Sequence, residues 1–312
     1  MFRKHREITH SLMSIPLSPS HPGRIRAWVL AARPQTLPAA VTPVVVGSAA
    51  ALETGSFRWG PFIAALVAAL LIQIGTNLAN DYFDFRKGAD TEERLGPTRV
   101  TQAGLLAPET VRNGMIATFG VAALIGVYLI VVGGWPILVI GVLSIAAGVL
   151  YTGGPWPLGY HGLGDLFTFI FFGIIAVTAT AYLHAGTVPP LAWAASAPVA
   201  MLVTAIIVVN NLRDIATDRR ASKRTLAVMI GARATRAEYA LLVVGAFLAP
   251  PLLWLGGLTG PWVLLAWLAA PLAIAPLRTM LTAEGRALNP ALKGTARLHL
   301  IFGLLLALGM VV

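Results

Sequence analysis

The chain is a succession of long apolar segments separated by short polar ones. Each apolar segment approaches the roughly twenty residues that a helix needs to cross the hydrocarbon core of a bilayer. Residues 1–23 instead mix charged residues, Ser and Pro, so we expect residues 1–32 to form a flexible arm ahead of a membrane domain over residues 33–312. The pattern predicts an all-α polytopic membrane protein with about nine transmembrane helices, at 36–55, 60–80, 113–133, 135–152, 165–185, 189–210, 236–256, 261–279 and 295–312.

Two of these segments end in a stripe of Asn and Asp residues. In the first stripe, Asn77, Asn80, Asp81 and Asp84 fall at positions i, i+3, i+4 and i+7, which share one face of a helix. Crowded carboxylates repel one another unless a cation lies between them, and hard oxygen ligands beside Arg and Lys suit Mg²⁺ that carries a phosphate. The second stripe repeats the pattern with three residues, Asn211, Asp214 and Asp218. With Asp90, the two stretches hold five of the six Asp residues in the chain.

Basic residues follow both stripes. Arg86, Lys87 and Arg99 come soon after the first stripe, and guanidinium forks suit the oxygens of a diphosphate. The second stripe runs into a basic segment that contains Lys223 and Arg224. The acidic residues of the first basic loop and of the helix start that follows it are interpreted as solvated surface groups; these are Glu92, Glu93 and Glu109.

A loop rich in glycine and aromatic residues lies between the fourth and fifth segments. Residues 151–165 contain five Gly and two Pro, which require a defined backbone path. Tyr151, Trp156 and Tyr160 offer ring surfaces to an apolar or cationic ligand, although Trp156 and Tyr160 fit an aromatic belt at the membrane interface equally well. Asp165 is interpreted as the cap of the next helix.

Composition and charge support a membrane protein with an oxygen-based site. The chain is 57% hydrophobic and 12% charged, and its zero Cys exclude disulfides and thiolate metal sites. A net charge of +10 is compatible with a nucleic-acid partner, but the positions of the basic residues along the chain argue against one. Of the 23 Lys and Arg residues, 22 lie before the first segment or in alternate loops, and only Arg58 lies on the other side. The positive-inside rule therefore predicts an integral cell-membrane protein with a cytoplasmic N-terminus, cytoplasmic Asp stripes and an external C-terminus.

Four motifs in this order resemble the UbiA superfamily of intramembrane aromatic prenyltransferases. They are Asn80-Asp81-Tyr-Phe-Asp84 with its basic extension to Asp90, Gly96-Pro97-Thr98-Arg99, Tyr151-Thr-Gly-Gly-Pro155, and Asn211-Leu-Arg213-Asp214-Ile-Ala-Thr-Asp218. Within the superfamily, they are most similar to the branch that prenylates 1,4-dihydroxy-2-naphthoate in menaquinone synthesis. The resemblance spans about residues 33–312 and implies a helical fold around a central cavity, with both Asp clusters at its cytoplasmic mouth.

The resemblance also assigns roles to individual residues. It implies two Mg²⁺ ions that bridge the diphosphate, with ligands drawn from Asp81, Asp84, Asp90, Asp214 and Asp218. Asp90 stands two residues beyond the position at which the superfamily often places its next carboxylate, because Gly88 occupies that position. Tyr151 would join the carboxylates in catalysis by stabilising a cation. The residues that would bind the diphosphate and the acceptor are Asn77, Asn80, Arg86, Lys87, Arg99, Asn211, Arg213, Lys223, Arg224 and Tyr160.

The implied reaction begins with ionisation of the allylic C–O bond of a polyprenyl diphosphate in the membrane. The cation then attacks the ring carbon of 1,4-dihydroxy-2-naphthoate that carries the carboxyl group, and loss of CO₂ restores aromaticity to give demethylmenaquinone. Two alternatives stay open at this point. The acceptor could be another aromatic such as 4-hydroxybenzoate, or the chain could be a cation-coupled transporter, which would require ionisable groups in mid-span. The sequence does not define the length of the prenyl chain.

Overall fold

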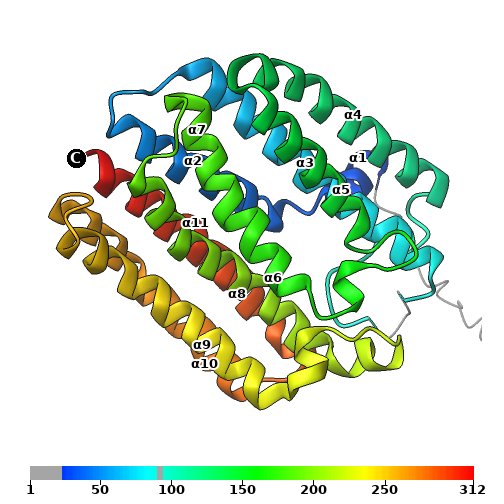
Figure 1. Ribbon diagram of the computed structural model, residues 1–312. Coiled ribbons are helices and arrows are strands. Elements are labelled where there is room, and N and C mark those ends of the chain that lie inside the picture. Colours follow the sequence, from blue (N-terminus) through cyan, green and yellow to red (C-terminus); the bar gives the residue numbers. More distant parts are fainter. Residues whose placement is uncertain (1–22, 90–93) are drawn as a thin grey trace, which may run out of the picture.

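The computed structural model describes residues 23–89 and 94–312, and every regular element within these ranges is a helix (Figure 1). The longer helices are α2 (Pro38–Leu52), α3 (Trp59–Arg86), α4 (Pro108–Gly133), α5 (Trp135–Leu150), α8 (Pro190–Arg220), α9 (Leu226–Leu255), α10 (Ala270–Thr282) and α11 (Asn289–Val311). The shorter elements are α1 (Arg24–Ala32), η1 (Pro34–Thr36), η2 (Leu158–Tyr160), α6 (Gly164–Thr168), the π-helical η3 (Phe169–Ile175), α7 (Ala176–Ala185), η4 (Pro261–Ala269) and η5 (Gly285–Leu288).

The all-α membrane architecture predicted from the sequence is confirmed, whereas the number of nine spans is approximate. Within the described ranges, seven helical stretches are long and apolar enough to cross a bilayer, and a pair bent by 49° between η1 and α2 raises the number to eight. Helix α5 has 16 residues. At about 1.5 Å per residue it is shorter than the roughly 30 Å core of a bilayer. Each of the nine predicted segments is nevertheless largely helical.

The ordered domain starts earlier than the sequence predicted. Helix α1 occupies residues 24–32, which had been assigned to the flexible arm, and its Ala27 and Ala31 are buried in a cluster with Leu78 of α3. In this structure residues 24–32 therefore form a helix that packs on the bundle, because the small side chains of α1 allow a close approach. The remainder of the predicted arm, residues 1–22, lies outside the described residues, as does the candidate ligand Asp90.

Proline and glycine define where several of the spans begin. Pro108 and Pro190 occupy the first turns of α4 and α8, where a missing backbone N–H costs no helical hydrogen bond. Gly134 joins α4 to α5 with φ 72°, a left-handed conformation that favours glycine. A single residue is therefore sufficient to turn the chain, and α4 and α5 contact each other.

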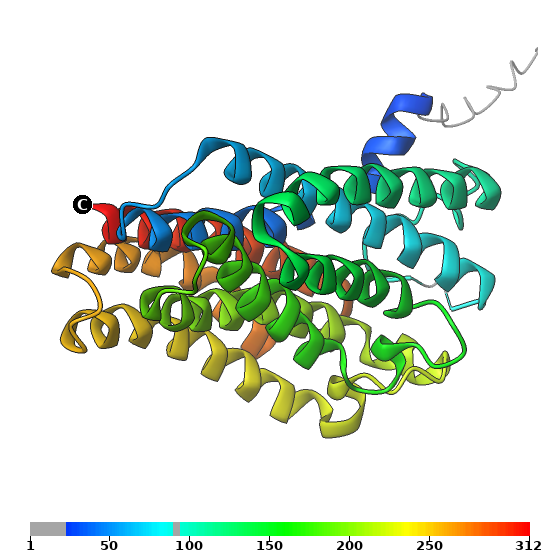
Figure 2. The same cartoon turned by 45° about the horizontal axis from the view of Figure 1, so that its top comes forward.

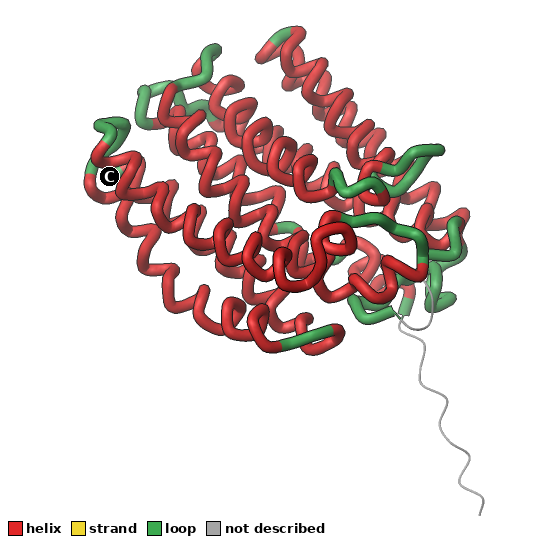
Figure 3. Tube along the Cα trace, turned by 60° about the horizontal axis from the view of Figure 1, so that its bottom comes forward, coloured by secondary structure: helices red, strands yellow, loops and turns green. Residues whose placement is uncertain are grey.

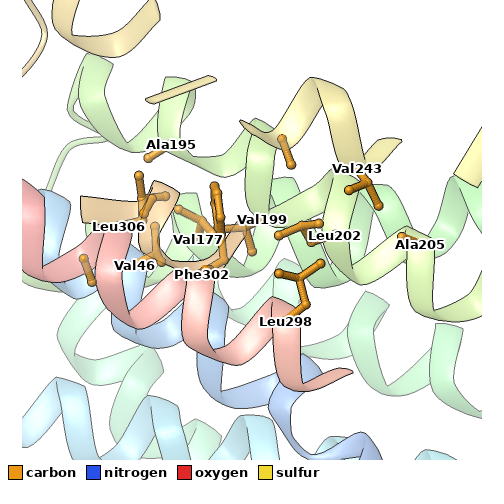
Figure 4. Packing of buried hydrophobic residues seen from close by; sticks show 14 of the residues in the cluster. Val46, Val177, Ala195, Val199, Leu202, Ala205, Val243, Leu298, Phe302 and Leu306 are labelled. Carbon is orange, nitrogen blue, oxygen red and sulfur yellow. The ribbon is translucent and has the colours of Figure 1, made fainter. Parts of the chain in front are cut away.

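Helix α8 forms the centre of the bundle. Its Val199 and Leu202 pack with Val46 of α2 and with Leu298 and Phe302 of α11 (Figure 4). Small residues allow the helices to approach closely, as is common where packing rather than the hydrophobic effect drives association in lipid. One such residue is Gly173 of η3, where an added Cβ would collide with Ala200 of α8.

Both Asp/Asn stripes arrive at the same end of the bundle, which we call the loop end. Helices α3 and α8 finish there, and the loop residues 87–89, 94–107, 151–163 and 221–225 gather there, opposite the C-terminus (Figures 1 and 2). Figure 3 shows these loops in green at the ends of the red helices. The backbone N–H of Arg224 donates to the carbonyl of Tyr160 at 3.0 Å, which ties two of the loops together. Segments far apart in the sequence are thus positioned to build one site.

Candidate active site

A cavity of about 650 Å³ opens among the helices that carry the two stripes. Its walls are polar near the loop end and become apolar deeper in the bundle, where Ala122, Ile130 and Ile145 of α4 and α5 line it. Ten of the residues singled out from the sequence line this cavity: Asn77, Asn80, Asp84, Arg99, Tyr151, Tyr160, Asn211, Asp214, Asp218 and Lys223. The two stripes therefore face a common space, although more than a hundred residues separate them in the chain.

Asp84 is the most heavily contacted carboxylate in the cavity. Its Oδ2 accepts a hydrogen bond from the Arg99 guanidinium at 3.0 Å, and its Oδ1 accepts from the Tyr160 hydroxyl at 2.8 Å and from the Lys223 ammonium at 3.2 Å. Asp84 and Arg99 are almost fully buried. A buried carboxylate that accepts from three donors is held in place, as a group that contacts metal or phosphate must be.

Asp81 has different partners from its neighbour in the stripe. Its two carboxylate oxygens accept hydrogen bonds from the backbone N–H groups of Val100 and Thr101, each at 3.0 Å. It is buried and does not line the cavity. Asp81 therefore fixes the path of the loop that delivers Arg99, a role that the sequence did not predict.

The second stripe is held by its own network. The Arg213 guanidinium donates to both oxygens of Asp214, at 2.8 and 2.6 Å, and also to the side-chain oxygens of Asn210 and Asn289. Arg213 is buried and does not line the cavity, so in this structure it orients Asp214. One turn earlier, Asn211 donates to Asp165 at 3.3 Å, which gives that carboxylate a partner across the bundle.

Like Arg213, three further basic residues expected to bind substrate do not line the cavity. Arg86 and Arg224 are exposed. Lys87 donates from its ammonium to the carbonyl oxygens of Thr152 and Gly154, at 2.6 and 3.3 Å, and so anchors the loop after α5. Partial burial lowers the pKa of Lys87, with Asp84 acting in the opposite direction. Their assignment as substrate-binding residues stays a prediction that the geometry of this structure does not favour.

The two tyrosines are arranged differently in the cavity wall. Tyr151 is enclosed by backbone, because an added Cβ on Gly159 or Gly164 would lie within 3.0 Å of its ring or hydroxyl. Burial, followed by the charge of nearby carboxylates, raises the pKa of Tyr151. Tyr160 bonds Asp84, and the Lys223 ammonium lies 4.7 Å from the centre of its ring. Trp156 is exposed and stacks on His161 instead.

Several lining residues were missed from the sequence. Arg33, Arg94 and Gln73 all border the cavity. Gln73 precedes Asn77 by four residues on α3, so extending the first stripe by one turn would have found it. Arg33 reaches the wall because the chain breaks between α1 and η1, where this residue adopts a left-handed φ of 52°. No sequence signal marks that conformation.

The acidic residues suit a metal that is shared with substrate. Among the described residues, no three acidic or histidine side chains gather closely enough to hold a metal ion between them. Asp84 on α3 and Asp214 and Asp218 on α8 nevertheless line one cavity. Mg²⁺ usually retains waters and binds one or two carboxylates together with substrate phosphates. The residues therefore fit Mg²⁺ bound with a diphosphate better than Mg²⁺ in a closed protein cage.

Known proteins resemble this chain in sequence and in fold. The model of the UbiA prenyltransferase family matches residues 40–307. A Mycobacterium tuberculosis protein named 1,4-dihydroxy-2-naphthoate octaprenyltransferase is 39% identical over 90% of this chain and 95% of its own length. A protein of the same name from Escherichia coli is 38% identical over 92% of this chain and 95% of its own length. The solved structure of a UbiA homolog from Archaeoglobus fulgidus bound to DMAPP and Mg²⁺ superimposes with a TM-score of 0.58 at 13% identity, covering 90% of this chain and 99% of that one.

Proposed function

This chain belongs to the UbiA prenyltransferase family, and we propose that it transfers a polyprenyl group from polyprenyl diphosphate to 1,4-dihydroxy-2-naphthoate. The products are the quinol form, demethylmenaquinol, together with diphosphate and CO₂. Relatives that are 33–39% identical carry this activity in their names. The observation that supports the proposal most directly is the single cavity in which both Asp/Asn stripes face each other at the loop end.

The shape of the cavity matches the two halves of the donor substrate. Its loop end holds carboxylates and cations, which suit a diphosphate, whereas its depth is lined by apolar residues of α4 and α5. Some of these residues, such as Val127 and Val142, are more than half exposed. A polyprenyl tail dissolved in lipid can therefore lie against apolar side chains while its diphosphate stays at the membrane interface.

We assign the metal-binding role to the carboxylates that line the cavity. Asp84, Asp214 and Asp218 would hold Mg²⁺, most simply as two ions, one beside each stripe. Bound there, Mg²⁺ would neutralise the charge that develops on the departing diphosphate. Mg²⁺ accompanies the allylic diphosphate in the Archaeoglobus homolog. Asp81 is placed outside this set, because both of its oxygens already bind backbone N–H groups.

The surrounding side chains bind and orient the substrates. Arg99 and Lys223 lie beside Asp84, where a guanidinium and an ammonium can contact diphosphate oxygens. Asn80 is fixed by a hydrogen bond from Thr152 at 3.0 Å. The face of the Tyr151 ring borders the cavity and would stabilise the allylic cation, and its burial excludes water that would otherwise capture the cation.

The distribution of charge supports a site at the cytoplasmic face of the membrane. Since nearly all Lys and Arg residues precede the first span or lie in alternate loops, we place the N-terminus and the loop end at the cytoplasmic face of the cell membrane and the C-terminus outside. A water-soluble naphthoate would then enter from the cytoplasm, and the prenyl donor from the lipid. Membrane lipid is the partner that this arrangement requires, and nucleic acid has no role in it.

Acceptor labelled at the carboxyl carbon tests the reaction. Purified protein in detergent or liposomes would receive polyprenyl diphosphate, Mg²⁺ and carboxyl-labelled 1,4-dihydroxy-2-naphthoate. We expect labelled CO₂, diphosphate and prenylated naphthoquinol in equal amounts. A parallel incubation with carboxyl-labelled 4-hydroxybenzoate should yield no prenylated product. Prenylated hydroxybenzoate that retains the label would instead reassign the acceptor, and cation flux without prenyl transfer would reassign the class of protein.

A further inference from the structure

Gln73 lines the cavity and carries an unsatisfied polar atom. It lies on α3 and lines the cavity together with Asn77 and Asp84, although only 7% of its surface is exposed. Its carbonyl oxygen, Oε1, is buried and has no hydrogen-bond partner among the described residues. A buried acceptor without a donor is costly. Such an atom in a substrate cavity points to a ligand that supplies the donor.

The opposite side of the Gln73 amide is fixed. Its Nε2 donates to the Thr36 hydroxyl oxygen at 3.0 Å, and the Asn77 Nδ2 donates to the same oxygen at 2.9 Å. The Thr36 hydroxyl proton is used on the carbonyl of Arg33 at 3.0 Å. Thr36 can therefore only accept from the two amides, which must both turn their NH₂ groups toward it. The second Nε2 proton of Gln73 is directed at the Asn77 Oδ1, at 3.5 Å. Gln73 therefore has only its carbonyl oxygen left for a further hydrogen bond.

Gln73 lies at the depth of the cavity at which the ring of the aromatic acceptor would lie. It precedes Asp84 by eleven residues on the same helix, which is a rise of about 16 Å. That length accommodates a metal-bound diphosphate, the reacting carbon and an aromatic ring in line. Arg33 lines the same cavity, and Thr36 connects its backbone to Gln73. The wall thus combines a cation with a neutral acceptor, a pairing suited to an aromatic acid that carries a hydroxyl group.

We propose that Gln73 accepts a hydrogen bond from a ring hydroxyl of the acceptor and so selects hydroxylated aromatic acids. The inference rests on the proposed function. In 1,4-dihydroxy-2-naphthoate the 1-hydroxyl lies beside the carboxylate and bonds it internally, whereas the 4-hydroxyl is free to donate. Gln73 therefore contacts the 4-hydroxyl. That contact orients the ring with its carboxyl-bearing carbon toward the prenyl group, so Gln73 is a specificity-determining residue and takes no part in bond breaking.

The test compares two acceptors that differ in this hydroxyl alone. Wild-type protein and Gln73→Leu would each be given 1,4-dihydroxy-2-naphthoate and 1-hydroxy-2-naphthoate, and kcat/KM would be measured for both. The acceptor ratio is kcat/KM for 1,4-dihydroxy-2-naphthoate divided by kcat/KM for 1-hydroxy-2-naphthoate. We expect this ratio to be at least about tenfold larger in the wild type than in Gln73→Leu. Any electronic effect of the missing hydroxyl is the same in both proteins and cancels from this comparison. The KM for polyprenyl diphosphate should change little.

Thr76→Val is the matched control. Thr76 lies on α3 and lines the cavity, and its hydroxyl is already bonded to the carbonyl of Ile72 within the helix, at 2.8 Å. Its removal should leave the acceptor ratio at the wild-type value. A purely structural role for Gln73 would lower the rates with both acceptors equally and preserve the ratio, which would overturn the proposal.

A second variant and the wild-type acceptor ratio allow the proposal to be tested even if Gln73→Leu does not fold. If Gln73→Leu does not accumulate as folded protein, Gln73→Met offers nearly the same length without the carbonyl oxygen. A wild type that does not distinguish the two naphthoates would overturn the proposal whatever the variants do. Failure of the proposed function looks different, because the wild type would then prenylate neither naphthoate.

Discussion

The Asp84 carboxylate and the Lys223 ammonium lie 3.2 Å apart, although 139 residues separate them in the chain. This ion pair joins the first Asp/Asn stripe to the loop that follows the second. Asp84 is buried and Lys223 is half-buried, and Arg99 contacts the other oxygen of Asp84. Asp84 thus positions the side chains of Lys223 and Arg99 at the cavity. A diphosphate that enters with its metal can replace Asp84 as their partner.

Asp84→Asn should reduce prenyl transfer at least about a thousandfold, since it retains the shape of the side chain but removes a charge from the metal site. It also leaves Lys223 without its counter-ion, so the Tm in detergent should fall. Adding Lys223→Met should recover part of the Tm and none of the activity. Glu109→Gln, at an exposed position in the first turn of α4, is the control and should change neither quantity. Equal loss in the control would show that the stripe carries no functional information.

Chelation of divalent cations should abolish turnover, and Mg²⁺ should restore it. Because the described residues form no cage of three acidic or histidine ligands, we further expect Mg²⁺ to bind weakly alone and tightly with a polyprenyl diphosphate. The coupling must be reciprocal, so Mg²⁺ should tighten binding of the diphosphate by the same factor. Calorimetry with each ligand alone and with both together measures it. Independent binding of the two ligands, or full turnover in excess chelator, would contradict this prediction.

The helical period explains why much of the site could be predicted from the sequence. Asn77, Asn80 and Asp84 share one face of α3 in any helix that contains them, and the bundle directs that face into the cavity. Asp81 shows the limit of the argument. It belongs to the same stripe, but the loop at Val100 and Thr101 covers it, and the path of a loop is not encoded in helical periodicity.

The sequence also does not distinguish which of two adjacent basic residues faces the cavity. Lys223 lines the cavity while Arg224 is exposed, because the turn after α8 directs neighbouring side chains to different sides. Ser222 adopts a left-handed φ of 56° in that turn, which the sequence does not reveal. Arg33 depends on a similar break between α1 and η1. The positions of residues on irregular backbone are therefore harder to predict from the sequence than those of residues on helices.

Asp81→Asn should mainly reduce stability. The amide side chain retains one acceptor oxygen and turns an NH₂ group toward the other backbone N–H, so one buried donor loses its partner at a cost of about 1–3 kcal/mol. We expect a lower Tm and a smaller loss of rate than in Asp84→Asn, with the rate recovering as the assay temperature is lowered. A large loss of rate at an unchanged Tm would instead make Asp81 a metal ligand, as the sequence predicted.

Two substitutions of Tyr151 separate the contribution of its aromatic ring to the reaction rate from that of its hydroxyl. Because burial raises the pKa of this phenol above its usual value near 10, the neutral form is favoured and no tyrosinate should form between roughly pH 6 and 9. If the ring face stabilises the allylic cation, Tyr151→Phe should retain the rate within about threefold and leave the pH profile unchanged. Tyr151→Leu should lose about tenfold to a hundredfold, the range expected for a desolvated cation–π contact together with its packing. Single-turnover rates with saturating substrates measure the effect, since they isolate the chemical step from product release. Equal losses in the two variants would show that the hydroxyl, not the ring, is the group the reaction uses.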